Sequence, residues 1–151
     1  MQSAAGAGQW MTPLVERPGM LHSEVLGEDR QYTVCLPYGY EASQERYPVL
    51  FLLDGPRHMN YAAGLVEYLS RYAEAISPVI VVDIAQQHRS RDMTPTPSRD
   101  HPNDTGGADR FLAFLSQELV AKCSASVARL SAFSHGASEP CRRSVTFVAT
   151  G

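Results

Sequence analysis

Two short segments of the chain are almost wholly apolar and lack the polar alternation of a half-exposed strand. They are Val49 to Leu53 and Val79 to Ile84. Such runs are typical of strands that are covered on both faces, as in a parallel sheet flanked by helices. The segment between them predicts a helix over about residues 61–75, because its apolar positions recur at near-helical spacing. These positions are Leu65, Leu69, Tyr72 and Ile76.

The order strand, helix, strand favours a right-handed βαβ crossover with two parallel strands. Before it, alternating residues predict a hairpin with strands at His22 to Leu26 and Arg30 to Leu36. Met1 to about Pro18 show no periodicity, and we expect a flexible arm there. The elements together predict an α/β fold whose sheet is mostly parallel, with an amino-terminal antiparallel hairpin and flanking helices.

A long polar loop from Gln86 to Gly107 follows the second apolar strand. Loops of this length tend to be functional or disordered. The next helix has Asp104 or Thr105 as its expected N-cap. Its apolar stripe is the clearest in the chain and consists of Ala108, Phe111, Leu112, Leu115 and Leu119.

The composition favours one globular domain and excludes several classes of protein. The chain has 151 residues, 44% of them hydrophobic, and a formal charge of -3, which argues against a nucleic-acid binder. The apolar runs are too short to span a membrane, and no signal peptide is visible. Cys35, Cys123 and Cys141 are odd in number and widely spaced, so we expect reduced thiols and a cytoplasmic protein.

The first apolar strand runs directly into Asp54-Gly55. In parallel sheets, ligands gather just beyond the carboxyl ends of the strands. The sequence therefore places a candidate site at this turn. An ordinary strand-ending turn, in which Asp54 makes local hydrogen bonds, is the alternative.

A succession of short motifs follows in order over roughly residues 22–120. The motifs are Leu26-Gly27-Glu28-Asp29-Arg30, Leu36-Pro37-x-Gly39-Tyr40, Tyr47-Pro48-Val49-Leu50 with Leu53-Asp54-Gly55, Arg91-Asp92-x-Thr94-Pro95-Thr96, and Gly106-Gly107-Ala108-Asp109-x-Phe111. This succession resembles the amino-terminal half of the esterases related to enterochelin esterase and S-formylglutathione hydrolase. The resemblance implies an incomplete α/β-hydrolase fold, a serine nucleophile and small-molecule carboxylic esters as substrates.

The resemblance also implies that the turn after the first apolar strand supplies an oxyanion hole. Gly55 lets the backbone approach, and the NH groups of Arg57 or His58 are the candidate donors, because Pro56 has none. Preorganised donors of this kind contribute roughly 3 to 4 kcal/mol to catalysis.

The segment containing Arg91 and Asp92 resembles the family's loop beside the active-site cleft, and with Asp54 these residues are the candidate cleft residues. The arginine could bind a substrate carboxylate, or it could hold Asp92 in a structural ion pair, which is the more common arrangement. His88 and His101 flank the loop without paired-histidine spacing, so we expect exposed histidines, no metal and no other cofactor.

The candidate nucleophile is Ser134, in Ala132-x-Ser134-x-Gly136, which imitates the sharp turn Gly-x-Ser-x-Gly. After it, the only acid is Glu139 and the only histidine is the adjacent His135, so the tail cannot complete a Ser-His-acid triad. His58 is a conceivable substitute base.

The composition changes near residue 121, which divides the chain into an arm (1–18), an esterase-like half domain (19–120) and an atypical tail (121–151). Residues 1–120 carry nine basic and fifteen acidic side chains, a net charge of -6, and residues 121–151 carry four and one, a net of +3. A change of reading frame near Val120 explains this shift and makes Ser134 a coincidence. A divergent true elbow is the alternative.

Two functions remain open from the sequence. The first is a serine esterase-like hydrolase, truncated and weakly active or inactive. The second is a noncatalytic fragment that binds a partner, or a second copy of itself, through an open edge of the strand at 49–53. Val145 to Val148 could cover that edge as a short strand, but we favour the open edge.

Overall fold

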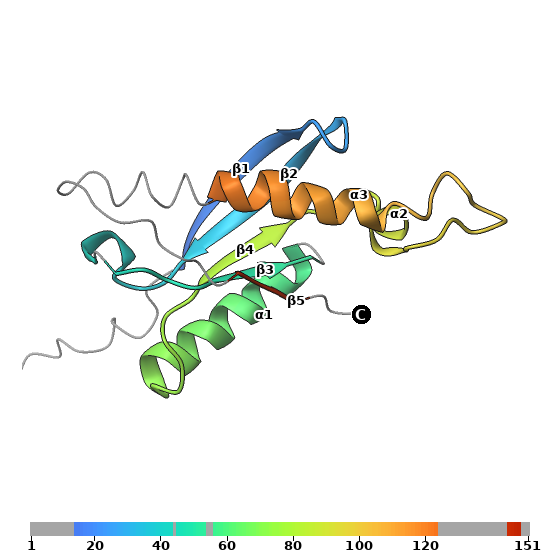
Figure 1. The fold of residues 1–151 in the computed structure, drawn as a ribbon. Helices are drawn as coiled ribbons and strands as arrows, with labels where there is room; N and C mark the ends of the chain where they lie inside the picture. Colours follow the sequence, from blue (N-terminus) through green and yellow to red (C-terminus); the bar gives the residue numbers. More distant parts are fainter. Residues whose placement is uncertain (1–13, 44, 54–55, 124–144, 149–151) are drawn as a thin grey trace, which may run out of the picture.

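A single five-stranded sheet organises the chain, in the strand order β1-β2-β4-β3-β5 (Figure 1). The computed structural model describes residues 14–43, 45–53, 56–123 and 145–148. The strands are β1 (Val15–Ser23), β2 (Glu28–Leu36), β3 (Val49–Leu52), β4 (Ile80–Ile84) and β5 (Val145–Val148).

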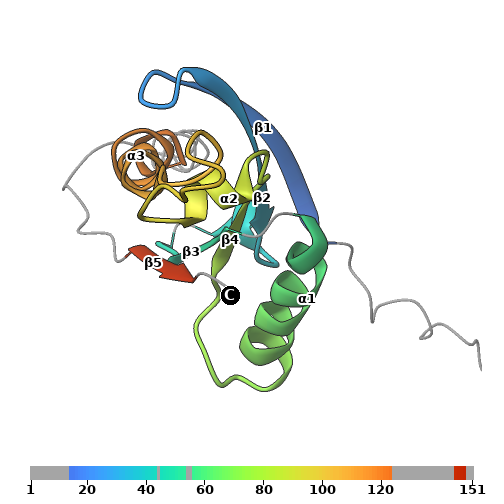
Figure 2. The same ribbon diagram turned by 90° about the vertical axis from the view of Figure 1, so that its right-hand side faces the viewer.

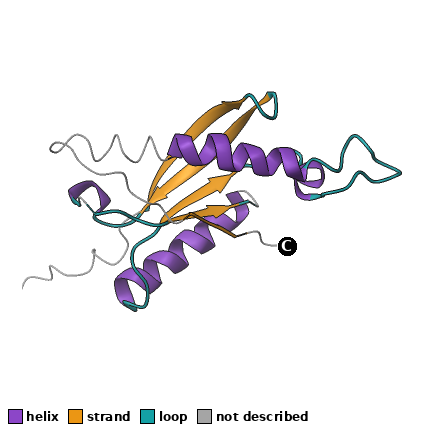
Figure 3. Cartoon of the chain, viewed as in Figure 1, coloured by secondary structure: helices purple, strands orange, loops and turns teal. Residues whose placement is uncertain are grey.

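Helices cover both faces of the sheet, and Figure 2 shows α1 and α3 on opposite sides of it. Two of the helices continue directly into a π-helical segment, so each is longer than its α-helical part. The helices are α1 (Pro56–Glu67) with Tyr68–Tyr72, α2 (Arg89–Met93), α3 (Ala108–Ala113) with Phe114–Leu119, and a 3-10 turn at Tyr40–Ala42. Figure 3 shows that loops make up most of the segment between β4 and α3.

The sheet is mixed, so the prediction of a mostly parallel sheet is wrong. β3 pairs in parallel with β4 and with β5, whereas β1 with β2 and β2 with β4 are antiparallel. The amino-terminal hairpin is not a separate ribbon, because β2 pairs with the central strand β4, where Thr33 lies opposite Asp83. The parallel β3-α1-β4 unit that the apolar runs predict is confirmed.

Alternate residues of β4 face two different cores, as expected for a strand with one helix layer on each side. Val81 faces α1, in a cluster that includes Leu52 and Met59. The other face packs against α3 in the larger cluster, whose β4 and α3 members are Ile80, Val82, Ile84, Phe111, Phe114, Leu115 and Leu119. This confirms the predicted apolar stripe of α3 for Phe111, Leu115 and Leu119. Ala108 is half-buried and Leu112 is 57% exposed.

The hairpin is confirmed and is longer than predicted. β1 pairs with β2 along its whole length, from Val15 opposite Leu36 to Ser23 opposite Glu28. Residues 15–18, which the sequence leaves in the flexible arm, therefore belong to a strand, and residues 1–13 lie outside the described part. Pairing with β2 is the reason, because the local sequence around Pro18 has no strand pattern of its own.

Two helix starts differ from the prediction. α1 begins at Pro56 and not near residue 61. α3 has Gly107 as its N-cap and not Asp104 or Thr105. The Thr105 hydroxyl instead donates to the His101 carbonyl and accepts the NH of Ser98, so it is used within the loop.

The side chains that α1 turns to the sheet also differ from the predicted apolar face. Met59 and Ala63 are buried against the sheet, at 4% and 3% exposure, whereas Leu65 and Tyr72 are 57% and 48% exposed. The apolar spacing therefore identified a helix correctly and its buried face incorrectly.

The edge of β3 is covered, contrary to the open edge that we favoured from the sequence. Val145–Val148 pair with β3 in parallel, with Val49 opposite Val145 and Leu52 opposite Val148. A second strand supplies partners for the NH and carbonyl groups that an edge strand would leave exposed. Within the described residues, no helix is long and apolar enough to cross a membrane.

A substitution of Phe114 tests whether the larger cluster is the main core of the fold. Its side chain is completely buried, so Phe114→Ala should lower the free energy of unfolding by about 3 to 5 kcal/mol. The exposed Leu112 is the control, and Leu112→Ala should change stability by less than about 0.5 kcal/mol. Urea unfolding followed by circular dichroism measures both, and equal effects would contradict the assigned core.

Candidate functional site

The carboxyl ends of the two parallel strands define the candidate site. β3 and β4 point to the same side, where α1 begins and α2 follows β4 (Figure 1). In open α/β sheets this edge is where ligands bind, because loops and helix starts meet there. Asp54 and Gly55, which follow β3 in the sequence, lie outside the described residues.

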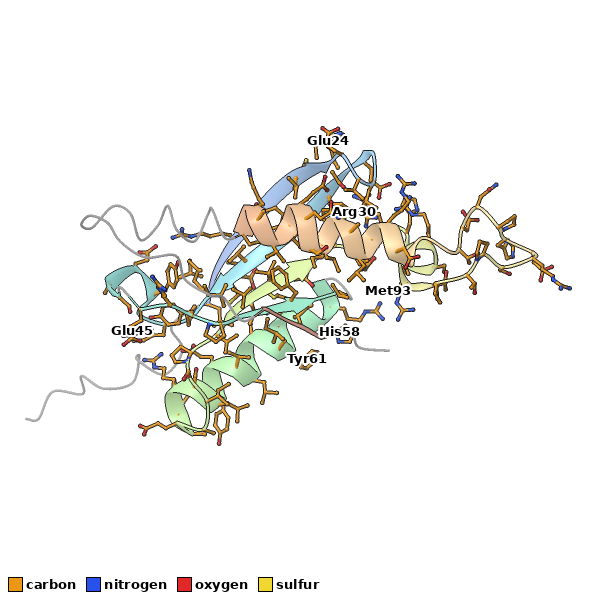
Figure 4. All side chains as sticks on the ribbon, viewed as in Figure 1. Glu24, Arg30, Glu45, His58, Tyr61 and Met93 are labelled. Carbon is orange, nitrogen blue, oxygen red and sulfur yellow. The ribbon has the colours of Figure 1, made fainter. Side chains whose placement is uncertain are left out.

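Arg57 and His58 stand in the first turn of α1 and not in a loop. Figure 4 labels His58 there. The first NH groups of an α-helix have no partner within the helix, and they point beyond its amino-terminal end. Pro56 at the start removes only an NH that the helix does not use. The role of Arg57 and His58 as oxyanion donors stays a prediction, supported by this placement.

Asp83 is a buried carboxylate at the same edge that the sequence analysis missed. It is 2% exposed, and it shares with Val81 the face of β4 that α1 covers. Its Oδ1 has no hydrogen-bond partner among the described residues. Burial raises the pKa of Asp83 to about 6, while the Ile84 NH and the nearby His58 act in the opposite direction. An acid inside an otherwise apolar strand was the available signal.

Gln86 joins the ends of β3 and β4. Its side-chain amide donates to the carbonyl of Leu53, the last described residue before the candidate turn. The amide oxygen is buried and has no partner among the described residues. This bond holds the exit of β3 against the loop that leaves β4.

A cluster of four charges holds the start of the long loop against the sheet. Arg91 Nη2 lies 2.6 Å from Glu28 Oε1, and Arg91 Nε lies 2.9 Å from Asp92 Oδ1. Arg30 Nη2 lies 2.6 Å from Asp92 Oδ2 and 2.5 Å from Glu28 Oε1. Two arginines and two carboxylates therefore balance each other, and the guanidinium of Arg30 also lies over the Phe111 ring.

Burial makes this cluster structural. Asp92 is 2% exposed and Arg30 is completely buried. Hydrogen bonding to Arg91 lowers the pKa of Glu28, and the same bond raises the pKa of Arg91. The ion-pair alternative for Arg91 and Asp92 is thus the arrangement found here, and a substrate contact by Arg91 stays a prediction.

Two hydrogen bonds beside this cluster tie the two ends of the long loop together. The NH of Gly107 donates to the carbonyl of Arg91 at 2.8 Å, and the NH of Gly106 donates to the Thr94 hydroxyl at 2.8 Å. The loop therefore leaves from and returns to one fixed point beside β2.

The remaining candidates are two histidines of the long loop and three residues of the tail. His88 and His101 are exposed, and the described residues contain no group of three or more His, Cys, Asp or Glu side chains that could hold a metal ion. Ser134, His135 and Glu139 lie outside the described residues, so their roles stay predictions.

The mixed sheet with a βαβ unit and helices on both faces defines an α/β protein, and solved hydrolases share its fold. An IroE-like serine hydrolase from Shewanella oneidensis is 36% identical, with a TM-score of 0.70. Siderophore hydrolase EstB from Aspergillus nidulans is 20% identical, with a TM-score of 0.62, and the match covers 76% of this chain and 45% of EstB. Enterobactin esterase FES from Shigella flexneri is 17% identical, with a TM-score of 0.57, and the match covers 76% of this chain and 27% of FES.

The sequence belongs to the esterase family described as "Putative esterase", whose model matches residues 23–132. The match with the Shewanella hydrolase covers 74% of this chain and 39% of that protein. No curated protein matches the sequence. The chain thus spans less than half the length of this relative, and the family match ends two residues before Ser134.

The charge cluster predicts a large effect of Asp92→Asn on stability. The substitution leaves the buried Arg30 without one of its two carboxylate partners and should lower the free energy of unfolding by about 3 to 5 kcal/mol. The exposed Asp100 serves as control, and Asp100→Asn should be nearly neutral. Chemical denaturation at pH 7 compares the two, and a neutral Asp92→Asn would show that the cluster does not support the fold.

Asp83 predicts a pH-dependent difference between the wild type and Asp83→Asn. Because its pKa is higher in the folded state than in the unfolded state, the fold is favoured by protonation and loses stability as pH rises from about 4 to 6. Asn cannot ionise, so the variant should become more stable than the wild type by roughly 3 kcal/mol above pH 7, at about 1.4 kcal/mol per pKa unit.

Urea unfolding of both proteins at pH 4, 5, 6 and 7 measures this difference. The pH dependence of all other groups cancels in the comparison. A stability difference that does not change with pH would show that Asp83 ionises normally in the folded chain.

Proposed function

We propose that the chain is a serine esterase-like hydrolase that acts on small-molecule carboxylic esters, with weak activity by itself. The family match over residues 23–132 is the observation that carries this proposal. The Shewanella relative, at 36% identity, is described as a serine hydrolase, and two more distant neighbours are described as a siderophore hydrolase and an enterobactin esterase.

The geometry beside β3 supports the chemistry of ester cleavage. Attack on an ester carbonyl places negative charge on one oxygen of a tetrahedral intermediate, and preorganised NH groups stabilise that charge. Arg57 and His58, in the first turn of α1, offer their backbone NH groups at the carboxyl end of β3. The positive end of the helix dipole acts in the same direction.

We expect weak activity because a serine nucleophile needs partners for proton transfer. A serine hydroxyl needs a histidine to accept its proton, and that histidine needs a carboxylate to orient it. Beyond Ser134 the chain has only His135 and Glu139 for these roles, and a histidine adjacent to the nucleophile cannot readily reach back to it. We therefore infer that residues 1–151 carry an oxyanion half-site without a full triad.

The alternative of a noncatalytic fragment that binds through an open strand edge is less well supported. Its premise was an unpaired edge of β3, and that edge pairs with β5. The cytoplasmic location and the out-of-frame origin of residues 121–151 stay predictions.

A backbone substitution tests the oxyanion assignment. Arg57→Pro removes one NH from the first helical turn, where proline is tolerated, and Arg57→Ala keeps it. With p-nitrophenyl acetate, Arg57→Pro should lower kcat by about 100-fold or more, and Arg57→Ala should lower it much less. Equal kcat values for the two variants, both folded by circular dichroism, would contradict the assignment.

The same assay tests the nucleophile. We expect slow turnover by the wild type, loss of turnover in Ser134→Ala, and labelling of Ser134 by a serine-directed phosphonate, seen by peptide mass spectrometry. The Shewanella hydrolase, assayed in parallel, provides the positive control. Neither turnover nor labelling in the wild type would contradict the esterase proposal.

A further inference from the structure

A buried carboxylate and a histidine lie together at the carboxyl ends of β3 and β4. Asp83 is the fourth of the five residues of β4, and it pairs with Leu52, the last residue of β3. His58 lies in the first turn of α1, which begins at the same edge (Figure 4). The strand ends and the helix start therefore bring both side chains to the candidate site.

His58 is on the side of α1 that faces the sheet. Ala62 and Val66 follow it at intervals of four residues, so the three lie along one side of the helix. Both of these residues pack against the cluster that contains Leu52 and Val81. A helical side chain also leans toward the amino-terminal end of its helix, which directs the half-buried imidazole of His58 to the edge where β3 ends.

Asp83 faces this histidine from the sheet. It shares with Val81 the face of β4 that α1 covers, and its buried Oδ1 has no hydrogen-bond partner among the described residues. Burial raises the pKa of Asp83 to about 6, while the hydrogen bond from the Ile84 NH and the charge of His58 act in the opposite direction. The imidazole is thus close enough for its charge to act on the carboxylate.

The other described members of this cluster are uncharged. Leu52, Val81 and Met59 are apolar, and burial raises the pKa of the Cys35 thiol to about 11, so the thiol is neutral near pH 7. A carboxylate and an imidazole interact more strongly in such surroundings than in water, because the effective dielectric constant is low.

A base and the acid that orients it consist of these two groups. A histidine accepts the proton of a nucleophile, and a carboxylate that is hydrogen-bonded to its other ring nitrogen fixes the tautomer and stabilises the imidazolium. Asp83 costs the fold stability at neutral pH, because burial favours its protonated form. Carboxylates with such a raised pKa are common at sites of proton transfer.

We propose, on the basis of the serine esterase function proposed above, that His58 is the proton acceptor of this site and that Asp83 positions it. The imidazole takes the proton of the Ser134 hydroxyl as the serine oxygen bonds to the ester carbonyl carbon. The imidazolium then gives this proton to the alcohol oxygen as the carbon–oxygen bond breaks, and water repeats both steps on the acyl-enzyme. The pair substitutes for the histidine and acid that the tail cannot place, in agreement with weak activity.

A titration tests the contact without any ester. Carbon-13 NMR follows the ionisation of the Asp83 carboxyl between pH 4 and 8. His58→Gln removes a neighbouring positive charge, so the pKa of Asp83 should rise by roughly half a unit or more. His22→Gln is the matched control, because His22 pairs with Asp29 in the hairpin, and it should leave the pKa of Asp83 unchanged. The same pKa in the wild type and in His58→Gln would overturn the pairing.

Ester turnover tests the role of the pair. His58→Gln keeps the backbone NH and removes the base, so kcat for p-nitrophenyl acetate should fall by about 100-fold or more with little change in KM. Asp83→Asn should lower kcat by about tenfold or more, although the same substitution is expected to stabilise the fold above pH 7. In the double variant Asp83→Asn should cause no further loss, because no histidine is left to position.

The two measurements separate failure of the pair from failure of the proposed function. Equal kcat values for the wild type and Asp83→Asn, or the same loss from Asp83→Asn with and without His58, would overturn the positioning role. No turnover by the wild type would contradict the proposed function and with it the role of base, and the titration would still decide the contact. Circular dichroism checks that each variant is folded.

Discussion

The double pairing of β4 is the constraint on which the rest of the structure depends. This strand bonds to β2 in antiparallel orientation and to β3 in parallel orientation, and all five of its residues are buried. Because both edges and both faces are occupied, the hairpin, the βαβ unit and the two helix layers must all meet on it. The same requirement fixes the position of the β3 carboxyl end, and hence the start of α1.

Two groups of buried polar side chains flank this strand on opposite faces, and they are stabilised differently. On the α3 side, Arg30 and Asp92 belong to a cluster in which every charge has an opposite charge within hydrogen-bonding distance. On the α1 side, Asp83 Oδ1 has no hydrogen-bond partner among the described residues, and burial raises the pKa of Asp83 to about 6. The first arrangement supports the fold and anchors a loop. The second is the kind of perturbed carboxylate that is common at functional sites, and it lies at the candidate edge.

Helix α1 takes part in both the candidate site and the core. Its first turn places Arg57 and His58 beyond β3, its inner side packs on Leu52 and Val81, and its outer side carries exposed aromatic side chains. A single element thus carries the proposed oxyanion donors, a core contact and an exposed apolar side.

The local sequence pattern was sufficient to predict the strands whose two faces are both buried. The apolar runs at β3 and β4 require burial on both faces, so they predicted a parallel unit correctly, and the motif order predicted the family. The direction of β2 relative to β4, and hence the mixed sheet, depends on contacts between residues about fifty positions apart, which periodicity does not encode. The pairing of β5 with β3 is of the same kind.

For the site, the sequence determined which residue types follow β3 and which could ionise, and only the tertiary structure decided their environments. Arg91 and Asp92 were visible as a pair, but their burial with Glu28 and Arg30 required β2 and α2 to meet. Likewise, Leu65 and Tyr72 predicted a helix, but which side of α1 is buried depended on where the sheet lies. Spacing specifies a helix face, and only the packing partner specifies whether that face is inside.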